Sequence, residues 1–278
     1  MSRFATAITA AATAASLSLA APSRASAQQQ SPSSSMREYE YTFRVSSSRN
    51  DDSPTIGTMR VSGDRGRIDI EGNKEGQFLL VTDGGRTLTV VHPDKREYEV
   101  TNAAEFERIV GTALRAVGPV VSISLESAHV AADHLGDGGA VAGRPTVRAR
   151  LAQDFVVRVR AFGFGGDADH QIVTTEYWFS PGLTLMRNPL LGLMEDAEAA
   201  LAQGDTAYVR VVADERNRLL GGATPLRRVV TSRGDKGKSS TQTLEITSLR
   251  ATHPDPRIFE IPAGYKRGSG ITWSASSR

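Results

Sequence analysis

Residues 59–100, MRVSGDRGRIDIEGNKEGQFLLVTDGGRTLTVVHPDKREYEV, contain four short alternating segments in succession. Their apolar pairs are Ile68/Ile70, Phe78/Leu80, Leu88/Val90 and Tyr98/Val100. Turn signals punctuate them at Gly63-Asp64, Gly72-Asn73, Gly84-Gly85 and Pro93-Asp94. This spacing fits an up-and-down antiparallel meander. The sequence therefore predicts a curved antiparallel sheet as the scaffold of the protein.

The residues just before the meander extend this sheet. The segment 37–46 alternates strictly, with Tyr39, Tyr41, Phe43 and Val45 on one side and polar residues on the other. This pattern predicts a half-buried strand, whose aromatic side either packs in the core or lines a ligand cavity. A second strand is expected over 55–62. The outward positions carry both signs of charge, which is typical of a solvated antiparallel face: Arg60, Arg67, Asp69, Glu71, Arg86 and Glu97.

Three later segments have helical periodicity. Residues 103–117 follow the capping-box spacing Asn102/Glu105 and end before a Gly-Pro pair. Residues 189–203 begin with proline and end before glycine. Residues 206–220 carry Tyr208, Val212 and Leu219 on one side. Each helix is amphipathic and must cover part of the sheet, so residues 37–267 are expected to form one α+β domain, a half-open β-barrel with helices on its concave face.

The second half of the chain contains further strand patterns. We expect strands over 121–125, 146–164 and 171–179, with a loop at 137–139 and a bulge near Gln153-Asp154. Strands over 226–233 and 239–249 should form a hairpin across 234–237. An ordinary hairpin tip explains Arg233-Gly234-Asp235 better than an adhesion motif does.

The N-terminus indicates export. A short basic start, a weak apolar run and Ala25-Ser26-Ala27 form a secretory signal peptide over residues 1–27, cleaved after Ala27. Residues 28–36 are a disordered Gln/Ser/Pro linker, and residues 268–278 are a disordered tail that leaves Trp273 without a role. We therefore expect a periplasmic or secreted protein with no transmembrane segment in its mature part.

Charge and cysteine content exclude several classes of function. The chain has 33 basic and 31 acidic residues, and the signal peptide holds Arg3 and Arg24 but no acid. The mature chain is neutral and offers no general phosphate-binding field, so nucleic acid is not an expected partner. The absence of cysteine removes disulfides, thiol nucleophiles and thiolate metal sites.

No catalytic constellation is visible in the sequence. The nucleophile elbow, the zinc-protease motif, the P-loop and the dinucleotide fingerprint are all missing. Two groups could hold a metal, one of His129, Asp133 and His134 and one of Asp167, Asp169 and His170. Solvated loops explain both better, because no regular element places a third ligand. We expect neither an enzyme nor a cofactor.

Four sequence segments resemble an uncharacterised family of exported bacterial proteins. They are residues 57–69 (GTMRVSGDRGRID), 92–98 (HPDKREY), 175–178 (TEYW) and 259–265 (FEIPAGY). That family is similar, more distantly, to the LolA-type periplasmic carriers of outer-membrane lipoproteins. The resemblance implies a half-open antiparallel barrel whose concave side is covered by helices and receives acyl chains. No functional residue of the carriers aligns with a particular position here.

Together these patterns predict a periplasmic binding or carrier protein for a lipid, a lipoprotein acyl chain or another hydrophobic small molecule. An incomplete barrel with helical lids leaves an apolar pocket between its layers. The residues expected to line it are Tyr41, Phe43, Ile68, Ile70, Leu88, Val90 and Met194. Two alternatives remain open. One is a sensor or scaffold that meets an envelope protein through the same sheet, and the other is a metal-dependent hydrolase built around His170.

Overall fold

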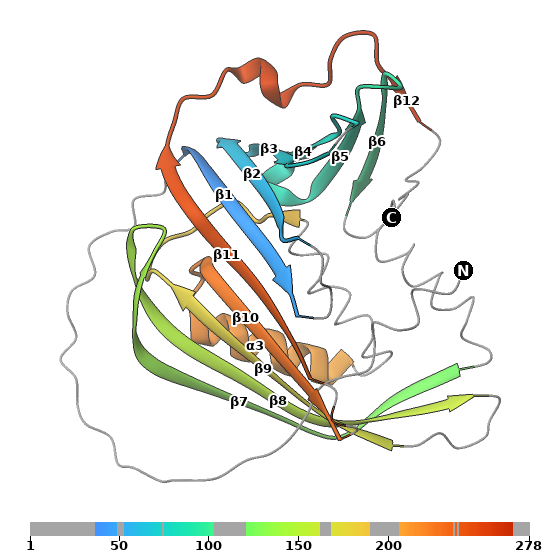
Figure 1. Cartoon of the computed structure of the whole chain (residues 1–278), viewed down its shortest axis with the longest axis vertical. Helices are drawn as coiled ribbons and strands as arrows, with labels where there is room; N and C mark the ends of the chain where they lie inside the picture. The colour runs from blue at the N-terminus through green and yellow to red at the C-terminus, as the bar shows by residue number, and fades with distance from the viewer. Residues whose placement is uncertain are drawn as a thin grey trace.

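The computed structural model describes residues 37–48, 53–73, 75–102, 121–161, 168–189, 206–235, 237 and 239–268. These residues form one twelve-stranded sheet (Figure 1). The strands are β1 (Glu38–Ser47), β2 (Thr55–Ser62), β3 (Arg65–Ile70), β4 (Phe78–Thr82), β5 (Thr87–His92), β6 (Glu97–Asn102), β7 (Val121–Val141), β8 (Arg144–Ala161), β9 (Ala168–Phe179), β10 (Pro225–Gly234), β11 (Ser239–Ala251) and β12 (Lys266–Arg267). The other elements are the 3-10 turns η2 (Asp83–Gly85) and η3 (Pro256–Phe259) and the helix α3 (Thr206–Leu220).

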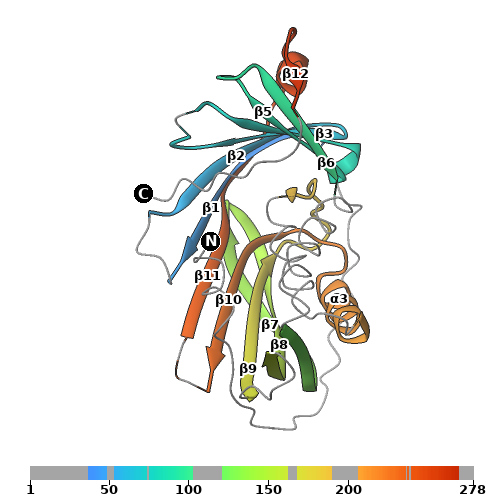
Figure 2. The ribbon, with the colours of Figure 1, turned by 90° about the vertical axis from the view of Figure 1, so that its right-hand side faces the viewer.

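The sheet is open and strongly curved. Its strand order is β12-β6-β5-β4-β3-β2-β1-β11-β10-β9-β8-β7. All pairs are antiparallel except β12 with β6, and the two terminal strands, β12 and β7, do not pair with each other. Figure 2 shows the β2–β6 end bent over relative to the β7–β10 end. The predicted meander is confirmed as β3–β6, and the β1–β11 pairing joins it to the second half of the chain.

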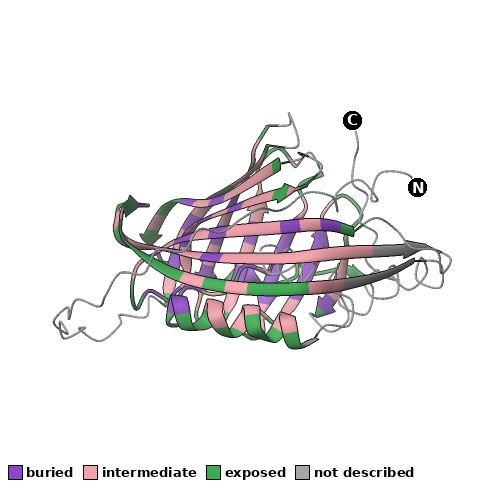
Figure 3. Cartoon of the chain, turned by 90° about the horizontal axis from the view of Figure 1, so that it is seen from below, coloured by how far each residue is buried: buried purple, intermediate pink, exposed green. Residues whose placement is uncertain are grey.

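The helix α3 has the bounds that the sequence predicts. It ends at Gly221 and Gly222, which have positive φ angles of 56° and 79°, a conformation that glycine adopts without strain. Leu219 and Leu220 pack with Ala149, Leu151 and other residues of β8 and β9. The opposite side of the helix is exposed (Figure 3). One helix therefore lies against the β7–β9 end of the sheet.

We define the inner face as the face that carries Tyr39, Tyr41 and Phe43 of β1, and the outer face as its opposite. Alternation along β1 is as predicted, because these three residues are buried. The strand pairing continues the inner face from β6 to β7, so α3 lies on it. A smaller apolar cluster of Phe78, Leu80 and Val91 lies on the outer face. Tyr265, in the segment after η3, packs against that cluster.

The structure corrects three expectations for the second half of the chain. Residues 137–139, expected to be a loop, belong to β7, which runs without interruption from Val121 to Val141. His129 and His134 also lie within this strand and not in a loop. The bulge expected near Gln153-Asp154 is on the partner strand, between Glu126 and His129 of β7. Ser127 lies in this bulge, and its positive φ of 52° bends the strand.

Several expectations fall outside the described residues. These are the signal peptide 1–27, the linker 28–36, the helix 103–117, the helix 189–203 apart from Pro189, Met194, and the tail from residue 269 onward, including Trp273. Within the described ranges, no helix has both the length and the apolar character needed to cross a membrane.

Candidate functional site: the inner face of the sheet

One apolar row crosses six neighbouring strands of the inner face. Strand register places Tyr41 opposite Met59 on one side and Leu249 on the other. Met59 in turn lies opposite Ile68, and the row continues through β4 and β5. Its members are Leu249, Tyr41, Met59, Ile68, Leu79 and Val90. Because each burial of such a side chain stabilises the fold by about 1.5–3 kcal/mol, this apolar row anchors the curved sheet.

Two tyrosines place neutral polar groups within this apolar surface. The hydroxyl of Tyr39 accepts a hydrogen bond from the backbone N–H of Met186, and the hydroxyl of Tyr41 lies 2.9 Å from Sδ of Met59. Burial raises the pKa of both phenols above the ordinary value. Both rings therefore stay uncharged and offer hydrogen bonds alone to anything that contacts them.

The structure brings together six of the seven predicted site residues. Tyr41, Phe43, Ile68, Leu88 and Val90 belong to one buried apolar cluster, and Ile70 is partly buried against it. The segment after β9 also joins this cluster, through Leu183, Leu185 and Met186. Met194 lies outside the described residues. That these residues line a ligand pocket stays a prediction, since core and pocket positions share one pattern.

Two hollows of the described residues lie on the outer face, and Ile70 is the one predicted site residue that lines either of them. One, of about 400 Å³, is lined by Thr58, Arg60, Arg67, Asp69, Ile70, Glu71 and Ile258. The other, of about 580 Å³, is lined by Arg37, Glu38, Ser62, Gly63, Asp64, Arg65 and His253. Both linings carry equal or nearly equal numbers of acidic and basic side chains, and many of these already pair with one another. Neither hollow has the character of an apolar site.

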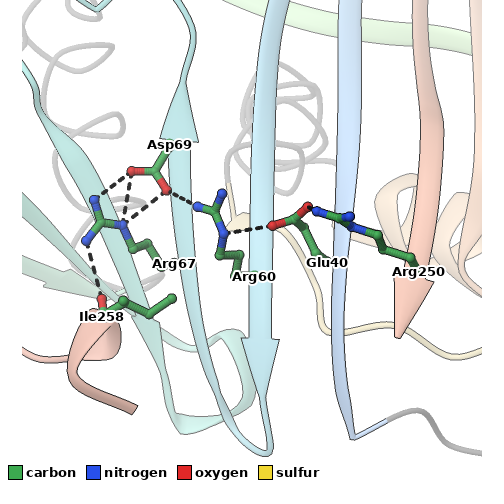
Figure 4. A network of polar contacts seen from close by, with 6 residues as sticks. All are labelled: Glu40, Arg60, Arg67, Asp69, Arg250 and Ile258. Carbon is green, nitrogen blue, oxygen red and sulfur yellow. Dashed lines mark hydrogen bonds and ion pairs between the residues drawn. The ribbon is translucent and has the colours of Figure 1, made fainter. Parts of the chain in front are cut away.

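A row of ion pairs crosses the outer face beside the first hollow (Figure 4). Glu40 of β1 pairs with Arg250 of β11 at 2.6 Å and with Arg60 of β2 at 2.8 Å. Arg60 also pairs with Asp69 at 2.8 Å, and Asp69 with Arg67 at 2.7 Å. Because its carboxylates and guanidiniums are engaged with each other, we interpret this row as a link between strands and not as a ligand site.

His170 and Asp169, considered from the sequence as metal ligands but assigned to a solvated loop, lie in β9 and do not come together. The two are neighbours on β9 and point to opposite faces: Asp169 is buried on the inner face beside Gln171, and His170 lies on the outer face. Nε2 of His170 is 2.7 Å from Asp154, and Nδ1 is 3.5 Å from Asp235. The part of the chain that is described contains no group of three acidic or histidine side chains placed to hold a metal.

The inner face also carries a buried histidine that the sequence reading missed. His92, at the end of β5, is 7% exposed and lies on the same face as Leu88 and Val90. In the described ranges, neither of its ring nitrogens has a hydrogen-bond partner. The alternation of β5 places this residue on the apolar face, directly before the Pro93-Asp94 turn.

Comparison with known proteins gives only distant structural likeness. No protein-family model matches the sequence, and no curated protein matches it. An uncharacterised conserved protein from Thermus thermophilus is 11% identical with a TM-score of 0.37, over 84% of this chain and 90% of that chain. PNGF-II is 9% identical with a TM-score of 0.32, over 84% of this chain and 31% of that chain. A LolA superfamily protein from Nitrosomonas europaea is 10% identical with a TM-score of 0.29, over 81% of this chain and 90% of that chain.

Proposed function

We propose that this protein is an exported periplasmic binding or carrier protein for a lipid, a lipoprotein acyl chain or another apolar ligand, and that it is not an enzyme. The observation that carries the proposal is the apolar row from Leu249 to Val90 on the inner face of a sheet that does not close. A closed barrel of small diameter fills with its own side chains, whereas an open sheet keeps its inner face for a second layer.

In this proposal the inner face is the ligand-binding surface of a LolA-like half-barrel. The sequence predicts helices at 103–117 and 189–203, and in this proposal they cover the concave side together with α3. An acyl chain that enters between sheet and covers gains about 0.8 kcal/mol for each methylene it buries. Binding then needs no charged contact, in keeping with the apolar character of the residues around Phe43 and Leu88.

Lipid extraction tests the proposal directly. The mature protein is purified from a native envelope and extracted with organic solvent, and the extract is analysed by mass spectrometry. We expect a co-purified lipid or acylated molecule at close to one equivalent. Sequencing the purified protein from its N-terminus tests the export signal at the same time, because cleavage after Ala27 leaves Gln28 as the first residue.

Two neighbouring valines on β5 provide a matched pair of variants. Val90 lies on the inner face and Val91 on the outer face, and both are buried. Val90→Thr introduces a hydroxyl at the proposed ligand surface, so it should lower lipid recovery. Val91→Thr introduces the same hydroxyl in the outer cluster and should leave recovery unchanged. Repeated absence of lipid from the wild-type protein contradicts the carrier proposal.

The β7 edge favours an interaction module as the second candidate. This strand has 21 residues, and within the described chain it pairs only with β8. A free strand edge can accept an extended segment from another protein. A defined complex with an envelope protein, lost on Ala131→Lys and formed without bound lipid, would support this candidate over the carrier.

A further inference from the structure

His92 is the least satisfied polar side chain on the apolar inner face. The residue is 7% exposed, and Nδ1 and Nε2 are both without hydrogen-bond partners in the described residues. A buried polar group left without a partner costs the fold free energy, so such groups are rare and usually have a functional or solvent partner. The position of His92 therefore calls for a polar partner beyond the residues that the structure describes, and a bound ligand can supply one.

The surroundings of His92 combine apolar and acidic character. Along β5 the inner face continues from His92 to Val90 and Leu88. Across the sheet, β6 places Glu97 opposite His92 and Glu99 opposite Val90, so both carboxylates belong to this face. On the same face β12 places Lys266 beside Glu97, which offsets one of the two carboxylates and leaves a net negative charge. An anionic group at His92 would be repelled by that charge, whereas an uncharged group would not.

We propose that His92 binds the head group of an amphipathic ligand whose hydrocarbon tail lies along the inner face. This inference rests on the proposed function and names the ligand class of the same site. A neutral imidazole has one N–H donor and one nitrogen acceptor. The head group that satisfies both, beside Glu97 and Glu99, is uncharged and carries a carbonyl next to a hydroxyl, as a monoacylglycerol does. Leu88, Val90 and the apolar row then hold the tail.

Competition binding tests this assignment. N-phenyl-1-naphthylamine, an uncharged fluorescent apolar probe, is bound to the delipidated full-length mature protein and displaced by 1-monolaurin or by laurate. We expect monolaurin to compete more strongly than laurate. His92→Leu should weaken monolaurin binding by about thirty-fold, the loss of two buried hydrogen bonds, once the affinity of the naphthylamine probe has been measured separately for each variant.

Two further variants separate a head-group contact from a general effect. His92→Gln keeps a donor and an acceptor and should retain part of the monolaurin affinity. His253→Leu removes an exposed histidine on the outer face and should leave the monolaurin affinity unchanged. If His92→Leu does not fold, ring-nitrogen NMR of the wild-type protein gives the same answer, because monolaurin must shift the His92 signals.

The outcomes distinguish the two proposals. If the naphthylamine binds but monolaurin does not shift the His92 signals, the head-group assignment is overturned and the carrier function stands. The same conclusion follows if His92→Leu binds monolaurin as tightly as the wild-type protein does. Stronger binding of laurate than of monolaurin overturns the assignment of an uncharged head. Failure of both the naphthylamine and the amphiphiles to bind overturns the carrier function and this inference together.

Discussion

Nε2 of His170 on β9 lies 2.7 Å from Oδ1 of Asp154 on β8, on the outer face of the sheet. The other ring nitrogen lies 3.5 Å from Asp235 in the turn after β10. One imidazole therefore joins β8 to the tip of the β10–β11 hairpin across β9. The hydrogen bond to Asp154 is the main reason that the pKa of His170 is raised, because the carboxylate stabilises the imidazolium.

The stability of the protein should depend on pH through His170. A raised folded-state pKa means that the contact contributes fully below the unfolded value of 6.5 and is lost as pH rises through the folded pKa. The side chains of His170, Asp154 and Asp235 are about a third or more exposed, so water screens their contacts. Between about pH 5 and pH 8.5 we expect the free energy of unfolding of the wild-type protein to fall by about 0.5–1 kcal/mol more than that of His170→Gln. Urea unfolding at both pH values measures it. Asp154→Asn removes the main partner of His170 and should reduce the pH dependence in the same way as His170→Gln.

The contact between Gly57 and Phe43 predicts a strongly destabilising substitution. A Cβ at Gly57 would meet the Phe43 ring and come within 2.9 Å of Cδ1 of Ile70. Gly57→Ala therefore forces the Phe43 ring and the Ile70 side chain away from β2. We expect it to lower the free energy of unfolding by about 1–3 kcal/mol, as is typical of overpacking. Chemical denaturation should show this loss. Thr58→Ala, next along β2 and on the other face, should cost much less, and an equal cost for both would contradict the packing argument.

Local patterns predicted the parts of the fold that depend on neighbouring residues. The alternation of Tyr39, Tyr41 and Phe43 gave the buried face of β1, because successive strand residues point to opposite faces. The helical stripe that ends before Gly221 gave α3 with its observed bounds, because glycine ends helices without strain. The hairpin tip around Gly234 followed from its turn residues.

Features that depend on long-range pairing could not be predicted. Nothing in the local sequence indicates that β1 pairs with β11, about 200 residues later, or that the segment containing Tyr265 covers Phe78 and Leu80. The glycines and charges around 136–139 resemble a loop, but in β7 they are bulges on an edge strand, where irregular pairing is tolerated. His92 was missed because its significance lies in the absence of a partner among the described residues, which no pattern encodes.

The ion-pair row on the outer face should contribute unequally along its length. Glu40 is the shared partner, with a side chain 14% exposed, whereas Arg60 is 34% and Arg250 is 71% exposed. Water and salt screen an exposed pair more strongly. In double-mutant cycles we expect a coupling of about 0.5–1 kcal/mol for Glu40–Arg60 and a smaller value for Glu40–Arg250. Added salt should weaken both couplings. A larger coupling to Arg250 would contradict this ranking.

The hydrogen bond from the Met186 N–H to the Tyr39 hydroxyl should hold the segment after β9 on the inner face. Tyr39→Phe keeps the ring, which stacks on Tyr41 with centroids 6.3 Å apart, and removes only the acceptor. We expect a loss of about 1–2 kcal/mol in the free energy of unfolding, because a partly buried N–H is left unpaired.

Hydrogen exchange gives the sharper measurement of this contact. In Tyr39→Phe the Met186 amide should exchange much faster, since the opening of this segment no longer breaks a hydrogen bond, while amides in the β3–β4 pair should keep their protection. Tyr265→Phe, in the outer-face cluster, is the matched control and should leave Met186 protected. Unchanged exchange at Met186 in Tyr39→Phe would show that the apolar contacts of Leu183 and Leu185, and not the hydroxyl, hold this segment on the sheet.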